Sequence, residues 1–249
     1  MKKFILMALV GILTSGTAFA LPWNNLKTIS LSKNGNISLQ IEPQLIEKSL
    51  LDPAKNSKGI LSQDSDSITP LFICRLSAND PTLYQIDYDM GPSDDPTFVI
   101  KRLGEGGAFT EVLAANALKI YIPGNNAIYT EGHTNNLFNQ KRKYQAQLGV
   151  ITEVKQPFYY VGVKGKLYQE FTLYTDVSMK DVVAKLPANS QVEVLLAENI
   201  DFYKPKLLLK TDFGLTGWVE VIGSQHDWIE SEPGKFSGNG IEGVYFAGD

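Results

Sequence analysis

The stretch from Phe171 to Val221 constrains the fold most, because short apolar runs there are separated by turn-forming residues. Gln191 to Val194 alternates polar and apolar residues, which is the period of two that a half-buried strand requires. Pro187 to Ser190 and Asp212 to Gly214 have the composition of tight turns. About five short strands in roughly fifty residues are most easily stabilised by a sheet that curls and protects its edges. The sequence therefore predicts a small β-barrel.

Particular residues within this stretch follow one another in a characteristic order: Leu186-Pro187, Gln191-Val192-Glu193-Val194, Leu209, Gly214 and Gly217-Trp218-Val219. This order resembles the pattern of the bacterial SH3-like (SH3b) family. Lys206-Leu207 departs from it, since many members carry a tryptophan there. Members of the family serve as recognition or targeting modules on cell-wall and envelope proteins. The resemblance thus implies an SH3-like barrel over residues 156–222 that binds a ligand.

SH3-type barrels bind extended ligands in grooves lined by aromatic residues between loops. The strand pattern places four aromatic residues on or beside such loops, and we expect them to bind the ligand: Tyr174, Phe202, Tyr203 and Trp218. Core packing is the competing interpretation of these rings. It is favoured for Trp218, whereas the two interpretations are balanced for Tyr203.

Residues 1–20 have the three regions of a secretory signal peptide. Lys2 and Lys3 precede an apolar run from Phe4 to Leu13, and small residues end the segment at Ala18-Phe19-Ala20. We expect cleavage after Ala20 and a periplasmic or secreted protein. The apolar run is too short to span a bilayer, and no later stretch is long and apolar enough to do so.

Residues 21–155 continue the all-β pattern, and repeated strands at short spacing predict a sandwich of two antiparallel sheets. An Asn34-Gly35 turn joins the first two strands as a hairpin. Leu45 to Leu51 suits a helix of one or two turns, and the alternation from Tyr144 to Val150 predicts one strand. The polar segment from Asp52 to Ser67 suits a loop. Residues 223–249 are rich in glycine but carry enough apolar residues to pack on the body.

The composition excludes several kinds of site. A formal net charge of −4 argues against nucleic-acid binding, and we interpret the basic cluster Lys141 to Lys143 as a solvated strand end. Two histidines, His133 and His226, and one cysteine, Cys74, supply no metal-ligand motif. We expect no cofactor and no metal. Cys74 lies in an apolar, strand-like run and is expected to be buried.

The sequence thus predicts an exported, non-catalytic envelope protein whose SH3-like module binds a peptide, the peptidoglycan of the cell wall, or another envelope protein. The alternative is an envelope hydrolase of cell wall or peptide. It would use a Cys-His site built on Cys74, or paired carboxylates, for which Glu105, Glu111 and Glu131 are the nearest candidates. The two hypotheses differ in whether Cys74 or two acids open onto a cleft.

Overall fold

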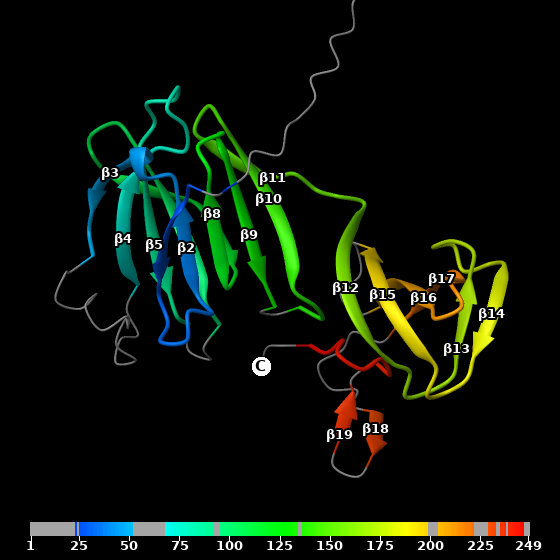
Figure 1. Ribbon diagram of the computed structural model, residues 1–249. Helices are drawn as coiled ribbons and strands as arrows, with labels where there is room; N and C mark the ends of the chain where they lie inside the picture. The colour runs from blue at the N-terminus through cyan, green and yellow to red at the C-terminus, as the bar shows by residue number, and fades with distance from the viewer. Residues whose placement is uncertain are drawn as a thin grey trace, which may run out of the picture.

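A computed structural model describes residues 23, 25–51, 68–91, 95–133, 136–198, 204–221, 229–232, 235–237 and 239–246. The signal segment, the segment from Asp52 to Ser67, and the predicted ligand residues Phe202 and Tyr203 lie outside these ranges. In the described part the chain is nearly all β, with three large sheets built mostly of antiparallel pairs (Figure 1). The same part contains no helix with the length and apolar character needed to cross a membrane.

Two sheets form the N-terminal half. The first has the strand order β1-β2-β8-β9-β10-β11 and the second the order β3-β4-β5-β6-β7. The strands of the first sheet are β1 (Lys27–Ser30), β2 (Ser38–Ile41), β8 (Lys119–Ile122), β9 (Ala127–Gly132), β10 (Gln140–Gln147) and β11 (Val150–Glu153). Those of the second are β3 (Ile46–Ser49), β4 (Thr69–Cys74), β5 (Tyr84–Asp89), β6 (Thr97–Leu103) and β7 (Phe109–Asn116).

The two sheets share one apolar core, which makes this half a β-sandwich. Alternate residues of both sheets are fully buried between them, among them Leu39 and Ile120 from one sheet and Ile86 and Phe98 from the other. Strands β2 and β8 pair in parallel, whereas their other neighbours in the sheet pair antiparallel.

Two local expectations for this half are wrong. Residues 43–45 form a single 3-10 turn, η1 (Pro43–Leu45), and the chain then enters β3, where its backbone pairs with β4. The expected strand from Tyr144 to Val150 is divided by a turn, because Leu148 and Gly149 adopt φ of 52° and 77°. Two consecutive positive φ values build the tight turn that suits a two-residue hairpin, and the turn joins β10 to β11.

The third sheet, which we call the C-terminal sheet, has six strands in the order β12-β15-β16-β17-β13-β14 (Figure 1). They are β12 (Phe158–Lys166), β13 (Phe171–Tyr174), β14 (Val182–Leu186), β15 (Gln191–Glu198), β16 (Lys206–Thr211) and β17 (Thr216–Glu220). Its buried face forms a second core, with Leu173, Val194 and Leu209 completely buried. The short hairpin of β18 (Ile229–Glu232) and β19 (Lys235–Ser237) follows it.

Residues 239–246 return to the body of the protein. Ile241 and Val244 are completely buried in the second core, and Ile241 bridges to Leu167 just after β12. A Cβ added to Gly165 would collide with the carbonyl oxygen of Glu242. Residues 239–246 can therefore approach β12 this closely only because Gly165 has no side chain.

Segments from the sandwich also reach the second core. Leu137 and Phe138, between β9 and β10, are nearly buried there. The backbone N–H of Tyr245 donates to the Leu137 carbonyl oxygen at 3.2 Å. His133 packs its ring against Tyr245 with centroids 4.6 Å apart, and its Nε2 lies 2.9 Å from the Tyr245 carbonyl oxygen. The two halves are therefore joined by packing as well as by the chain between β11 and β12.

Candidate binding surfaces

An apolar row crosses the C-terminal sheet on the face opposite its core. Cross-strand pairing aligns one residue from every strand of that sheet, and directly opposed residues share a face. In sheet order the row consists of Tyr160, Leu196, Leu208, Trp218, Tyr174 and Val182. Their chain neighbours Ala197, Leu207 and Val219 belong to the second core, so the row points outward.

The row contains two of the four predicted ligand residues. Tyr174 and Trp218 are register partners on β13 and β17. Phe158 packs its ring on Trp218 with centroids 5.1 Å apart. This contact and the neighbouring strands reduce the exposed fraction of Trp218 to 8%. The expectation that Trp218 is packed and not free is therefore confirmed by its burial, although the ring lies against Phe158 and outside the second core cluster.

The row is exposed at both ends and half-buried at its centre. Tyr160 on β12 and Val182 on the edge strand β14 are 62% and 57% exposed. Sequence reasoning missed Phe158 and Tyr160, which it assigned only to a junction between domains. The sequence feature that could have revealed them is the spacing of two positions between these aromatic residues, because strand alternation places such a pair on one face of a sheet.

The candidate thiol is sealed from solvent. Cys74 ends β4 inside the first core, with no exposed surface. Burial, helped by the nearby charge of Glu47, raises the pKa of its thiol to about 12. A reactive cysteine requires an accessible thiolate, so Cys74 cannot serve as a nucleophile in this fold. His133 contacts the C-terminal segment instead.

The three candidate carboxylates do not share one sheet. Glu105 lies in the turn between β6 and β7 and Glu111 within β7, both in the second sheet. Glu131 lies on β9 in the first sheet. Within the described ranges, no three His, Cys, Asp or Glu side chains gather as metal ligands would.

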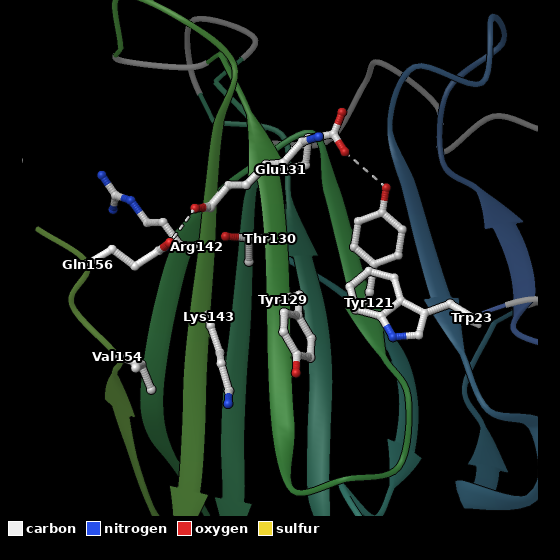
Figure 2. A pocket seen from close by; sticks show the side chains of 10 residues that line it. Trp23, Tyr121, Tyr129, Thr130, Glu131, Arg142, Lys143, Val154 and Gln156 are labelled. Atoms are coloured by element: carbon white, nitrogen blue, oxygen red, sulfur yellow. Dashed lines mark hydrogen bonds between the residues drawn. The ribbon is translucent and has the colours of Figure 1, made fainter. Parts of the chain in front are cut away.

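The basic cluster lies at the beginning of β10, as expected of a solvated strand end. Lys141, Arg142 and Lys143 are the second to fourth residues of this strand and are exposed or half-exposed, and they line a hollow on the outer face of the first sheet (Figure 2). Tyr121 on β8 and Tyr129 on β9 form the floor of this hollow together with Trp23. The pattern of turn residues 123–126 predicts the β8–β9 hairpin, which the structure confirms. Sequence reasoning did not assign the rings of Tyr121 and Tyr129 to a site, and it missed Trp23, which precedes the first strand and reaches them only in the folded chain.

Comparison of the chain with protein-family models, with curated proteins and with solved structures gives no match. The function must therefore be argued from the two surfaces.

Proposed function

We propose that the protein is an exported, non-catalytic protein of the cell envelope whose C-terminal sheet, an SH3-like module, binds an extended peptide segment of an envelope protein or of the cell wall. The apolar row is the observation that supports this proposal. It combines aromatic and aliphatic side chains on a face that the protein's own core leaves uncovered. The resemblance to the SH3b family supports the same function independently of the row.

The dimensions of the row favour an extended ligand. Neighbouring strands lie about 4.8 Å apart, so six strands span up to about 24 Å, the length of roughly seven residues of extended peptide. Aromatic rings supply large contact areas at a small cost in side-chain entropy. Leu208 and Tyr174, the half-buried neighbours of the nearly buried Trp218, are suited to hold an apolar side chain of such a ligand, while Tyr160 and Val182 contact its ends.

The alternative of an envelope hydrolase has less support. The thiol that a Cys-His site would use, that of Cys74, is buried. The candidate carboxylates of a two-acid site are divided between two sheets. The burial of Cys74 also gives the thiol a simpler role, as a small apolar residue of the core.

The proposal is tested by site-specific photo-crosslinking in cells that express the full chain. A photoreactive amino acid replaces Tyr160 or Val182, which lie at the two ends of the row. The control position is Lys164, which is exposed on the same strand and the same face as Tyr160 but outside the row. We expect cross-links to one envelope component from both ends of the row and none from Lys164.

A second variant, Tyr174→Ala, removes one ring from the row without touching either core cluster. We expect the cross-linking yield to fall by about tenfold, because a buried aromatic contact contributes on the order of 1–2 kcal/mol. Co-sedimentation with purified peptidoglycan shows whether the partner is the cell wall. Equal cross-linking from the control position, or a yield unchanged by Tyr174→Ala in a folded variant, contradicts the proposal.

A further inference from the structure

A second surface, independent of the apolar row, lies on the outer face of the N-terminal sandwich. It is a hollow of about 530 Å³ over β8, β9 and β10 (Figure 2). We call it the aromatic hollow, and the lining residues that matter for its chemistry are Trp23, Tyr121, Tyr129, Glu131, Lys141 and Lys143. A hollow of this size is within the range of small-ligand sites, which combine apolar walls with a few placed polar groups.

The three aromatic rings of Trp23, Tyr121 and Tyr129 form its apolar floor. Tyr121 and Tyr129 are register partners on β8 and β9, and the Trp23 ring packs on both, with centroids 5.1 and 4.8 Å away (Figure 2). Ile120 and Ile122, which flank Tyr121, are buried in the first core, so the tyrosine rings face outward by strand alternation. Trp23 keeps 38% of its surface exposed and leaves a ring available to a ligand.

A carboxylate is fixed beside these rings. Glu131 accepts a hydrogen bond from the Asn139 side-chain amide at 2.8 Å and one from the Tyr121 hydroxyl at 3.2 Å. Burial favours its neutral form, but the Asn139 hydrogen bond and the charges of Lys119 and Lys141 outweigh burial and lower the pKa of Glu131. Glu131 is therefore an ionised acceptor, and a carboxylate has room for about four hydrogen bonds.

The rim carries more positive than negative charge. Lys119 lies 3.6 Å from Glu131 and Arg142 lies 3.9 Å from Glu153, so these cations have acidic neighbours. Lys141 and Lys143 add two further cations from β10, and the Lys143 ammonium lies 6.0 Å from the centre of the Tyr129 ring. The excess positive charge attracts a ligand with negative charge.

We propose that the aromatic hollow binds a saccharide that carries a carboxylate. A pyranose has an apolar face of C–H groups, which packs on aromatic rings, and an edge of hydroxyl groups, which donate and accept hydrogen bonds. Trp23 and Tyr129 match the apolar face, Glu131 accepts from hydroxyl groups, and Lys141 and Lys143 pair with the sugar carboxylate.

Other ligand classes fit the same groups less well. A cationic ligand would meet the lysines of β10, and like charges placed together disfavour binding. A purely apolar ligand would cover the Glu131 carboxylate without offering it a donor, which is costly for an ionised group. The acidic saccharide is the class that satisfies the rings, the acceptor and the cations together.

The test uses protein purified from cells that express the full chain. Its binding is measured on an array of acidic and neutral saccharides that includes oligogalacturonate and the same oligomer with its carboxylates methyl-esterified. The strongest binder is then titrated by calorimetry. We expect selective binding of carboxylate-bearing saccharides, with affinity lowered about tenfold by esterification and lowered further at high salt, because the charges are partly exposed.

Three variants assign the binding to the hollow. Trp23→Ala removes an exposed ring and is expected to weaken binding about tenfold, and Lys143→Gln and Glu131→Gln are expected to weaken it severalfold. Tyr160→Ala, in the apolar row, is the matched control and should leave saccharide binding unchanged. No binding to any acidic saccharide, equal binding of the esterified form, or full binding by Trp23→Ala would overturn the proposal without affecting that for the row.

Discussion

At the residue scale, burial decides the chemistry of individual side chains more than their type does. Cys74 and Tyr121 show this in different ways. The thiol lies in the first core and has no exposed surface, and burial raises its pKa to about 12. Burial, followed by the charge of Glu131 and its hydrogen bond, also raises the pKa of Tyr121 to about 12. Tyr121 therefore remains a neutral donor that orients the Glu131 carboxylate.

Cys74 gives a prediction at this scale. The folded protein should resist alkylation by iodoacetamide at pH 8 and react fully in concentrated guanidinium chloride, as mass spectrometry would show. Because the folded pKa lies above the ordinary value of 9.0, only the unfolded state ionises above about pH 9. The contribution of the thiol to stability is therefore present below that pH and is lost as the pH rises towards 12. Rapid labelling of the folded protein would contradict the buried position.

At the scale of elements, turns set which residues of neighbouring strands meet. The turn at Leu148-Gly149 fixes the register of β10 with β11, just as the Gly124 and Asn126 turn, with φ of 89° and 57°, fixes that of β8 with β9. The register of β8 with β9 matters for the proposed saccharide site, because it places Tyr121 beside Tyr129. A slip by one residue would turn the rings of one strand to the other face.

The hairpin of β10 and β11 gives a prediction at this scale. Leu148 has a φ of 52° and is 90% exposed, so it bears backbone strain without the benefit of burial. Asparagine tolerates this conformation better than leucine. We expect Leu148→Asn to raise the free energy of unfolding by about 0.5–1 kcal/mol, measured by urea denaturation. A matched change, Val150→Asn, alters an exposed residue in β11 and should not stabilise the protein.

At the scale of the whole molecule, the sandwich and the C-terminal sheet have separate cores that share a boundary. Leu137 and Phe138 extend from the β9 to β10 connection into the second core, while Tyr245 contacts His133 and Leu137. The apolar row and the aromatic hollow belong to different halves. Their relative position therefore depends on this boundary as well as on the connection between β11 and β12.

Phe138 tests the coupling between the halves. Its side chain is 7% exposed, and truncation of a buried phenylalanine costs about 3–5 kcal/mol. We expect Phe138→Ala to lower the melting temperature and to increase hydrogen exchange in β15 and β16 of the C-terminal sheet, measured by mass spectrometry. If faster exchange is confined to the connection that carries the substitution, the two halves are not coupled through this side chain.

The sequence by itself determined the all-β class and most strand positions, because the period of two and the turn residues are local properties that need no partner strand. It placed Tyr174 and Trp218 on or beside ligand-binding loops but did not predict their pairing, which the register of β13 with β17 decides. It missed the turn at Leu148, because a leucine with positive φ has no local signal, and it assigned residues 45–51 to a helix because it could not show that β4 would pair with that segment.

Only the tertiary structure decided which strands are neighbours and which face of each sheet is covered. Tyr160 and Val182 belong to one row through pairings across six strands, and Trp23 meets Tyr121 nearly a hundred residues along the chain. Such contacts depend on long-range register and on the burial of a common core. A pattern read along one strand contains neither, which is why both surfaces emerged only from the folded chain.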